Sequence, residues 1–578
     1  MDIKKTIAIS AAAAVTTGAV AGTTVLKMKR ICPLCEVKKL AARKKFTQKA
    51  QGEYNNGTCL TPPMGWSCWN LFNKNIEENM IKEMADAMVQ SGMLEAGYNY
   101  LNIDDCWQAS ERDIHGALEY NKLTFPNGIK SLATYANDRG LKLGLYSCNG
   151  SYTCENYPGS LRHEAIDADT MASWGIEYFK YDYCHNEEIS YKAPQITSVT
   201  VSTADTSADV IADFKPSELK LSGQAKIAKK AKLKTGEYMV GLDSNLGKCN
   251  FEVTAPKAGQ YILTIGARKQ SYDEKFMIVN LNGEDKIHMY APKIRTLITG
   301  NKENYLQTTV SLKEGVNSFE ITNPVGSKKD SAAVQYKLMG QELKRASKQY
   351  AEKTGEIEKP IVYSICEWGV NSPHLWGSEA GNLWRTTHDI GANWASILGI
   401  YEFNSTLYKY ATKGGWNDPD MLEVGLGSLT YEENKSHFSL WCMMAAPLIL
   451  GNDIRAFIKA DGSIDTSNKV YQILTNKDLI AIDQDELGMQ CRVESHGTVD
   501  VLVKPLADAK VAICVFNKGN SKTEKDVKLD EIANLGYVHL PKKDAYTVKD
   551  AWSGEVVDGL ATITAKPEKH GVCVYIVE

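Results

Sequence analysis

The stretch Tyr178-Phe179-Lys180-Tyr181-Asp182 places an acid directly where an extended apolar run ends. Two other stretches share this pattern: Ile361-Val362-Tyr363-Ser364-Ile365-Cys366-Glu367 and Tyr100-Leu101-Asn102-Ile103-Asp104-Asp105. A helical stretch follows each of these two before the next run begins. Parallel α/β barrels display catalytic groups in this way, at the carboxyl ends of their strands. The pattern predicts an α/β fold, a (β/α)8 TIM barrel, whose acids serve acid/base or nucleophilic chemistry on a neutral, hydroxyl-rich substrate.

The composition favours a large folded protein without a nucleic-acid partner. The chain has 578 residues, enough for several domains with substantial cores. Its net charge of -4 offers no electrostatic attraction to nucleic acid. Aromatic residues make up 9% of the chain and include 11 Trp, which suits either large cores or carbohydrate sites. The sequence does not indicate an oligomeric state.

The amino terminus has the features of a targeting segment. Lys4 and Lys5 precede an uncharged run from Thr6 to Leu26, and basic residues follow at once. The run just reaches membrane-spanning length, and the basic flank suits a retained anchor better than a cleaved signal. We expect a signal peptide or membrane anchor over 1–30, a basic linker over 31–57, and a secreted or surface-anchored protein. The 14 cysteines fit export.

The alternation of strands and helices is interrupted once. Residues 58–190 alternate short strands with helices, and residues 330–487 resume the same pattern. Between them, residues 191–329 show only strands and turns, including the hairpin signal Asn282-Gly283. We therefore expect a β-sandwich inserted between a barrel strand and its own helix. Residues 488–578 are expected to form a C-terminal antiparallel β domain.

Seven motifs resemble family 27 of the glycoside hydrolases, the group typified by α-galactosidases. They occur in family order as PMGWSCWN (63–70), IDDCW (103–107), LKLGLY (141–146), KYDYC (180–184), CEWG (366–369), WRTTHDI (384–390) and GWNDPDM (415–421). Together they span about Leu60 to Gly488 without the insert, and seven collinear blocks are far more specific than any one alone. The resemblance implies a retaining exo-α-galactosidase that releases terminal α-galactose from oligosaccharides, polysaccharides or glycoconjugates, with no cofactor or metal.

The resemblance implies double displacement, with Asp182 as the nucleophile and Asp389 as the general acid and base. Lys180 lies two residues before Asp182 and so on the same face of the strand, which favours an ionised nucleophile. A general acid needs partial burial away from cations. Arg385 would therefore lower the pKa of Asp389 unless it mainly serves the sugar or another carboxylate. Retention usually requires the two carboxyl groups to lie about 5 to 5.5 Å apart.

The resemblance assigns other residues to substrate binding: Asp104 and Asp105 for the 4- and 6-hydroxyls, Trp69 for the apolar sugar face, Tyr146 and Lys180 in the pocket wall, and Arg385 and Asp420 for ring hydroxyls. A sugar without the matching hydroxyls would leave a buried acid unpaired. Family members that accept N-acetylgalactosamine carry small residues in the 366–369 segment. Here Cys366-Glu367-Trp368-Gly369 looks like the galactosidase version with larger residues, so Glu367 and Trp368 are expected to bind substrate and a 2-hydroxyl is expected.

Two cysteines, Cys154 and Cys184, match the family's active-site disulfide, and two free thiols are the alternative. The usual cysteine partner of Cys106 is missing shortly after Trp69, which puts a second disulfide in doubt. Cys68 lies nearby, but its position does not guarantee a pairing.

Each assignment has a structural alternative. Trp69 could belong to a core, Asp104 could cap a helix, Asp420 could be a turn residue, and Arg385 with Asp389 could form a surface ion pair on a helix. Rival functions are a β-L-arabinopyranosidase or α-N-acetylgalactosaminidase on the same scaffold, and a non-catalytic carbohydrate-binding surface protein. The insert resembles carbohydrate-binding modules in its strand rhythm, which favours polysaccharide binding; the alternatives are a spacer or a dimer contact.

Overall fold

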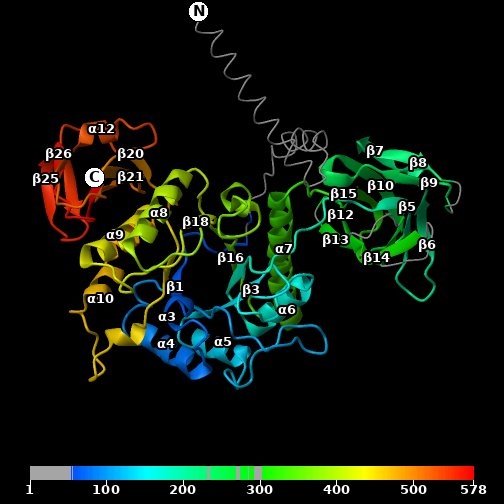
Figure 1. Ribbon diagram of the computed structural model, residues 1–578, viewed down its shortest axis with the longest axis horizontal. Helices are drawn as coiled ribbons and strands as arrows, with labels where there is room; N and C mark the ends of the chain where they lie inside the picture. The colour runs from blue at the N-terminus through cyan, green and yellow to red at the C-terminus, as the bar shows by residue number, and fades with distance from the viewer. Residues whose placement is uncertain are drawn as a thin grey trace, which may run out of the picture. The chain divides into compact units, whose positions relative to one another are not determined.

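A computed structural model describes residues 54, 56–230, 233, 235–268, 274–283, 285–291 and 303–578 (Figure 1). The chain divides into two compact units. Among the described residues, one unit is Glu188–Val334, and the other combines the described residues up to Glu187 with Gln335–Glu578. The targeting segment expected over 1–30 and most of the expected linker lie outside the described residues. In the described part, no helix combines the length and the apolar character that crossing a membrane requires.

Eight parallel strands form the predicted barrel, and the fold class is confirmed. They are β1 (Met64–Ser67), β2 (Tyr100–Asn102), β3 (Lys142–Cys148), β4 (Tyr178–Asp182), β16 (Val362–Cys366), β17 (Leu383–Arg385), β18 (Trp416–Asp418) and β19 (Leu448–Leu450). Their order in the sheet is β18-β17-β16-β4-β3-β2-β1-β19, with every neighbouring pair parallel. A parallel bridge between Leu422, just after β18, and Leu450 of β19 closes the barrel.

The two-residue period of a strand explains how β4 serves both the barrel interior and its outer layer. Lys180 and Asp182 line the cavity at the barrel mouth. The alternate residues Phe179 and Tyr181 are fully buried on the other side, where the Phe179 ring stacks on Tyr363 of β16 with ring centroids 6.5 Å apart. One short sequence therefore supplies a core face and a functional face.

Close strand packing depends on Gly144 of β3. A β-carbon at this position would lie 2.0 Å from Asn102 Oδ1 and 2.9 Å from Tyr178 Cβ. Any side chain here would therefore force apart the three strands β2, β3 and β4.

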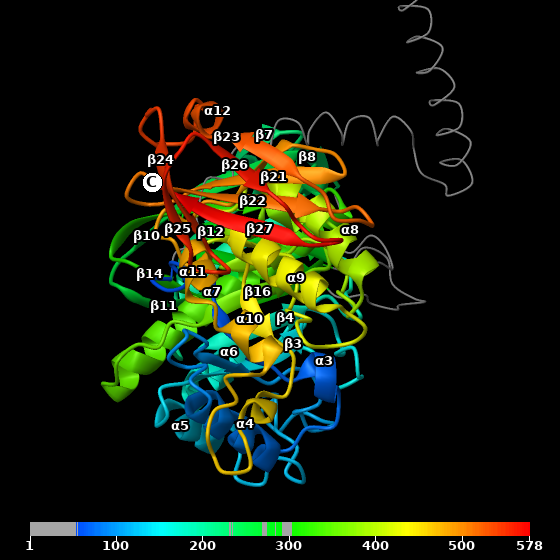
Figure 2. The ribbon, with the colours of Figure 1, turned by 90° about the vertical axis from the view of Figure 1, so that its left-hand side faces the viewer.

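Helices cover the outside of the barrel (Figures 1 and 2). They include α3 (Trp69–Phe72), α4 (Glu78–Gln90), α5 (Ile129–Asn137), α6 (Glu164–Trp174), α7 (Lys328–Thr354), α8 (Trp394–Asn404), α9 (Tyr431–Met443), α10 (Lys469–Leu474) and α11 (Lys477–Asp483). Met84 and Met88 of α4 are buried, and so are Tyr336 and Met339 of α7. Helix α7 follows β4 in the barrel order only after the inserted strands.

The inserted unit is a β-sandwich of two antiparallel sheets, ordered β13-β12-β15-β10-β7 and β14-β11-β5-β9-β8. Its strands are β5 (Gln195–Thr203), β6 (Val210–Phe214), β7 (Lys220–Gly223), β8 (Lys226–Lys229), β9 (Glu237–Val240), β10 (Gly247–Ala255), β11 (Gly259–Arg268), β12 (Lys275–Leu281), β13 (Asp285–Ala291), β14 (Glu303–Leu312) and β15 (Gly315–Thr322). Asn282 and Gly283 join β12 to β13 with positive φ angles of 53° and 76°, so the predicted hairpin is confirmed.

The C-terminal domain is an antiparallel β-structure that packs against the helices of the barrel. Its main sheet runs β20-β21-β22-β27-β24-β25, and β23 pairs with β26. The bounds are β20 (Arg492–Ser495), β21 (Val499–Pro505), β22 (Val511–Asn517), β23 (Lys525–Lys528), β24 (Tyr546–Asp550), β25 (Val556–Leu560), β26 (Thr562–Ala565) and β27 (Val572–Val577), with α12 (Leu529–Ala533) between β23 and β24. Trp394 of α8 stacks on His570 with ring centroids 4.8 Å apart, and β22 and β27 lie beside α9 in Figure 2.

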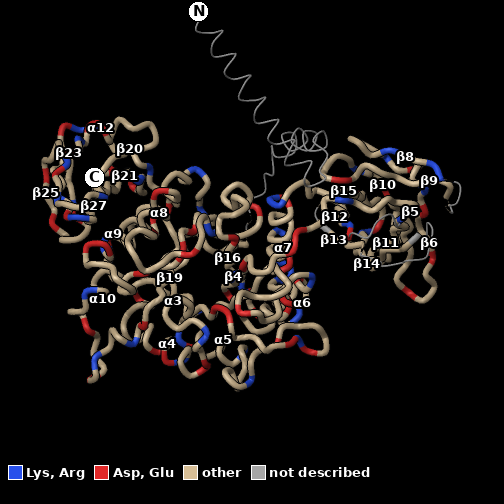
Figure 3. The backbone as a smooth tube through the Cα atoms, viewed as in Figure 1, with Lys and Arg blue, Asp and Glu red and all other residues tan. Residues whose placement is uncertain are grey.

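Acidic and basic residues are interspersed along the backbone of each unit (Figure 3). This distribution agrees with the balanced composition.

Candidate active site

A cavity of about 370 Å³ lies at the carboxyl ends of the barrel strands. Both acids assigned to catalysis from the sequence, Asp182 and Asp389, line it. The same cavity is lined by most residues expected to bind substrate: Trp69, Asp104, Asp105, Tyr146, Lys180, Trp368, Arg385 and Asp420. Its remaining lining is Asn70, Asn73, Cys154, Ile390, Gly391, Ala392, Met421 and Glu423. The fold thus brings residues from seven distant motifs around one space.

Asp182 ends β4 and is 5% exposed. Its Oδ1 accepts a hydrogen bond from the backbone N–H of Tyr183 at 2.8 Å, and its Oδ2 lies 4.0 Å from Lys180 Nζ. Burial raises the pKa of Asp182 to about 6, against the opposing effects of Lys180 and the Tyr183 N–H. Above that pH the carboxylate is mainly ionised, as a nucleophile must be.

Asp104 and Asp105 follow β2 and are held by different partners. Asp104 Oδ2 accepts a hydrogen bond from Lys180 Nζ at 2.7 Å. Asp105 accepts from the backbone N–H groups of Cys106 at 2.8 Å and Glu155 at 2.9 Å. Burial is the main cause that raises the pKa of the Asp105 carboxyl. Both carboxylates are therefore fixed in orientation at the cavity wall.

Asp389 shares its cation with a second acid. Arg385 Nη2 lies 3.0 Å from Asp389 Oδ1 and 2.7 Å from Asp420 Oδ2. The Asp389 side chain is 73% exposed, whereas that of Arg385 is 4% exposed. Partial desolvation would raise the pKa of Asp389, but the charges of Arg385 and Lys180 and the Arg385 hydrogen bond outweigh it and lower that pKa. The sequence analysis asked which group Arg385 serves, and in this structure it serves both carboxylates.

Asp420 is fixed by its surroundings in an uncommon backbone conformation. Its φ of 84° lies in the left-handed region, which costs free energy for a residue other than glycine. Its backbone N–H donates to Asp418 Oδ1 at 2.8 Å, and its carbonyl accepts from Trp441 Nε1 at 2.8 Å. Its Oδ2 also accepts from the backbone N–H of Ile390 at 2.8 Å. Asp420 is thus a turn residue and a cavity residue at once.

Comparison with known proteins identifies the family. The model of a family described as alpha galactosidase A matches residues 61–215 and 329–485, more than half of the chain. The chain belongs to this α-galactosidase family. A second family model, described as the alpha galactosidase C-terminal beta sandwich domain, matches residues 473–577.

Individual relatives of the α-galactosidase family cover nearly the whole chain. An alpha-galactosidase of Cyamopsis tetragonoloba is 30% identical over 550 residues, which is 93% of each chain. Alpha-galactosidase 3 of Arabidopsis thaliana is 32% identical, over 86% of this chain and 78% of its own. The crystal structure of alpha-galactosidase I from Mortierella vinacea is 25% identical with a TM-score of 0.60, covering 90% of this chain and 98% of its own.

Glu367 is the one predicted binding residue that the structure does not bring to the cavity. It is fully buried, and its two carboxylate oxygens accept from the backbone N–H of Asn371, each at 2.9 Å. The reason is the two-residue period of β16, which turns Ser364 and Cys366 toward the barrel interior. Glu367 continues the opposite side of the strand, and Trp368 returns to the cavity. The residue of this α-galactosidase segment that lines the larger cavity is therefore Trp368.

A disulfide joins Cys154 and Cys184 beside Asp182, with Cα atoms 5.1 Å apart. This is the pair that the resemblance implied. Cys68 and Cys106 are free thiols in this structure. In the described part of the chain, Cys154, Asp182 and Cys184 form the group whose potential metal-ligand atoms lie within 4.8 Å of one another, and the disulfide engages both sulfurs.

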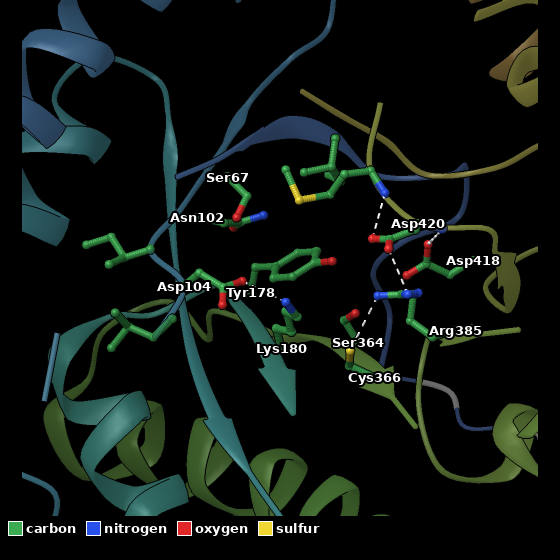
Figure 4. Close-up of a pocket in the computed structure, with 14 residues that line it drawn as sticks. Ser67, Asn102, Asp104, Tyr178, Lys180, Ser364, Cys366, Arg385, Asp418 and Asp420 are labelled. Atoms are coloured by element: carbon green, nitrogen blue, oxygen red, sulfur yellow. Dashed lines mark hydrogen bonds and ion pairs between the residues drawn. The ribbon is translucent and has the colours of Figure 1, made fainter. Parts of the chain in front are cut away.

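A smaller chamber of about 40 Å³ lies inside the barrel and shares Asp104, Lys180, Arg385 and Asp420 with the larger cavity. Figure 4 shows Asp104 and Lys180 on one side of it and Arg385 with two acids, Asp418 and Asp420, on the other.

The sequence analysis did not predict several residues of the chamber, and Cys366 and Asp418 are two of them. The Cys366 thiol accepts from Arg385 Nη1 at 3.6 Å. Burial raises the pKa of Asp418 to about 6. Both lie inside motifs that the sequence analysis quoted, and strand alternation could have indicated that Cys366 points inward.

Proposed function

We propose that this protein is an exo-acting retaining α-galactosidase that releases terminal α-D-galactose from oligosaccharides, polysaccharides or glycoconjugates. The observation that carries the proposal is that Asp182 and Asp389 line one cavity with Asp104, Asp105 and Lys180. A non-catalytic surface protein would have no need for two catalytic-type acids in the same enclosed space. Family membership adds that relatives with this architecture are named alpha-galactosidases.

In the first proposed step, an oxygen of the Asp182 carboxylate attacks the anomeric carbon of the bound galactose. The bond from that carbon to the departing oxygen breaks, and the Asp389 carboxyl group donates its proton to that oxygen. The products of this step are a galactosyl ester on Asp182, the released alcohol and an ionised Asp389. Lys180, 4.0 Å from Asp182 and 2.7 Å from Asp104, would keep both carboxylates oriented toward the sugar.

In the second step, Asp389 accepts a proton from a water molecule, and the oxygen of that water attacks the anomeric carbon. The ester bond breaks, which returns Asp182 as a carboxylate and releases galactose with its original α configuration. The 73% exposure of Asp389 suits this role, because the water must reach it from solvent.

In the free enzyme, the one proton that Asp182 and Asp389 share lies mainly on Asp182, whereas catalysis needs it on Asp389. Catalysis needs an ionised Asp182 and a protonated Asp389, yet the pKa of Asp182 is about 6 and that of Asp389 is lowered. The two arrangements contain the same number of protons, so they depend on pH identically. The working form is then a minor species until a substrate hydroxyl draws Arg385 away from Asp389.

This arrangement predicts an acidic optimum for kcat/KM. Above about pH 6 the shared proton is lost and no general acid remains, so kcat/KM should fall about tenfold per pH unit. Below the pKa of Asp389 both acids are protonated and the nucleophile is lost. The check is a pH profile of kcat/KM, with enzyme returned to the optimum after each exposure to exclude irreversible loss. A plateau extending to pH 8 would contradict the prediction.

The galactoside specificity predicts a clear order among three nitrophenyl glycosides. The α-galactoside should react at least about tenfold faster in kcat/KM than the β-L-arabinopyranoside, which lacks the hydroxymethyl group that Asp105 would bind. The α-N-acetylgalactosaminide should react least, because the large side chain of Trp368 lines the cavity and would crowd an acetamido group at the 2-position. A dominant rate on either of the last two substrates would overturn the proposed specificity.

We also propose that the protein is secreted or anchored at the cell surface, on the evidence of the uncharged run from Thr6 to Leu26 and the basic residues that follow it. The inserted β-sandwich would then hold polysaccharide substrate, in keeping with its resemblance to carbohydrate-binding modules.

A further inference from the structure

A buried glutamate behind the cavity wall has no part in the mechanism above. Glu367 is fully buried and comes directly before Trp368, which lines the cavity. The loop that Glu367 begins turns sharply, with left-handed φ angles of 56° at Trp368 and 72° at Gly369. Both carboxyl oxygens of Glu367 face the backbone N–H of Asn371 at 2.9 Å, and Oε1 also accepts from Asn371 Nδ2. These hydrogen bonds close the loop and offset the cost of its left-handed tryptophan.

The contact does not require an ionised carboxylate. Burial raises the pKa of Glu367 to about 7, against the lowering effect of its hydrogen bonds from Asn371. In the acidic range predicted for the reaction, one oxygen of Glu367 therefore carries a proton and the other remains an acceptor. Oε1 is the oxygen that both the backbone N–H and the side-chain amide of Asn371 reach, so a neutral Glu367 keeps both contacts through it. A glutamine at this position would offer the same acceptor.

Asn371 extends the contact to the residue that follows the nucleophile. Its Nδ2 also donates to the Tyr183 hydroxyl at 2.9 Å, so the two hydrogens of this amide are divided between Glu367 and Tyr183. Asn371 is 8% exposed, and its carbonyl accepts from Trp376 Nε1 at 3.1 Å. The Tyr183 ring packs edge-on against Trp368, with ring centroids 5.9 Å apart. The loop after β16 thus holds both the ring and the hydroxyl of Tyr183.

Tyr183 in turn orients the nucleophile. Its backbone N–H donates to Asp182 Oδ1 at 2.8 Å. The loop after β3 holds the same piece of backbone from another direction, because Asn149 N–H donates to the Asp182 carbonyl at 2.9 Å and a disulfide joins Cys184 to Cys154. A reacting group that is misplaced by about 1 Å can lose about 10²-fold in rate. The fixed position of Tyr183 therefore matters for the attack by Asp182.

We propose that Glu367 is a positioning residue for the nucleophile: through the Asn371 amide it holds Tyr183, whose N–H orients the Asp182 carboxylate. The inference rests on the proposed function and adds to it a residue whose side chain lies outside the cavity. Removal of the Glu367 side chain would leave the buried N–H of Asn371 without its acceptor. The loop would then be free to move, and the tether to Tyr183 would be lost with it.

The test isolates the attack by Asp182 in the full-length protein. A dinitrophenyl leaving group needs no proton, so its release from dinitrophenyl α-galactoside by saturating excess enzyme measures formation of the galactosyl ester. Glu367→Ala should slow this single-turnover rate about tenfold or more. Glu367→Gln keeps the accepting oxygen and should stay within about threefold of the wild-type rate. Tyr183→Phe removes the hydroxyl that Asn371 holds and should also slow the rate.

A double-mutant cycle tests whether Glu367 acts through Tyr183. The double variant of Glu367→Ala and Tyr183→Phe should react no more slowly than the slower single variant, because both changes break the same tether. Glu164→Ala is the matched control. Glu164 of α6 is also a buried glutamate whose pKa burial raises to about 7, and it does not line the cavity. Any loss in Glu164→Ala should add to the loss in Tyr183→Phe.

Three results would overturn the inference: an unchanged rate in folded Glu367→Ala, additive losses from Glu367→Ala and Tyr183→Phe, or a Glu367→Gln variant as slow as Glu367→Ala. Asn371→Ala removes the amide but keeps the backbone N–H that Glu367 accepts, so it supplies the same cycle with Tyr183→Phe if Glu367→Ala does not fold. Wild-type protein inactive on dinitrophenyl α-galactoside would instead refute the proposed function.

Discussion

Asp182→Asn lowers kcat on nitrophenyl α-galactoside by at least about 10⁴-fold, if Asp182 is the nucleophile. An amide cannot form the galactosyl ester, so neither half of the double displacement can proceed. The change is conservative in shape, because the amide oxygen can still accept the Tyr183 N–H hydrogen bond that fixes Asp182 Oδ1. Thermal unfolding should verify that the variant is folded, and steady-state assays at high enzyme concentration should measure the residual rate.

A matched control separates this role from a general effect of charge. Asp418 also ends a barrel strand, is buried, and has a pKa that burial raises to about 6, but it does not line the catalytic cavity. Asp418→Asn should therefore lose far less activity, with any loss arising through the backbone of Asp420. Comparable losses in the two variants would remove the case for Asp182 as nucleophile.

Azide gives a stereochemical test of the same role. In Asp182→Ala, azide can enter from the face that the carboxylate occupied while Asp389 still protonates the leaving group. The expected product is β-galactosyl azide, because a single displacement inverts the anomeric carbon. Its configuration can be read by NMR, and an α-configured product from this variant would contradict the assignment.

Strand alternation explains which of the predicted site residues line the cavity and why one of them does not. In β4, Asp182 lies two residues after Lys180 and therefore on the same side of the strand. The motif and the two-residue period of a strand thus agree on which side chains face the cavity. In β16 the motif indicated Glu367. Ser364 and Cys366 of this strand face the barrel interior, so Glu367, one residue after Cys366, faces away from it. A motif identifies a segment, but the period of the strand decides which of its residues reaches the substrate.

Other features of the site depend on tertiary structure and lie beyond sequence reasoning. The division of Arg385 between Asp389 and Asp420 requires the parallel pairing of β17 with β18. The left-handed backbone of Asp420 gives no signal in composition, since turn motifs favour aspartate for several reasons. Likewise, Asn70 and Glu423 are 353 positions apart in the chain and meet only because the barrel closes.

The expected loss in Asp389→Ala depends on the leaving group, which distinguishes an acid/base from a nucleophile. For galactosides of sugars or simple alcohols, kcat should fall by about 10²- to 10⁴-fold, because the departing oxygen needs a proton. A dinitrophenyl leaving group needs none, so formation of the galactosyl ester should stay close to the wild-type rate. Its hydrolysis still lacks a base, and the assay should show a burst of dinitrophenol equal to the enzyme concentration.

In Asp389→Ala, azide tests the second step, the breakdown of the galactosyl ester on Asp182. It needs no general base, so it should accelerate turnover of the dinitrophenyl substrate and displace Asp182 from the galactosyl ester. Two inversions give α-galactosyl azide, the opposite anomer to that expected from Asp182→Ala. Because the Asp389 side chain is 73% exposed, its removal should change the free energy of unfolding by no more than about 1 kcal/mol. If Asp389→Ala lost the same factor in kcat on every leaving group, or if both variants gave the same anomer of galactosyl azide, the assignment of Asp182 as nucleophile and Asp389 as acid/base would be wrong.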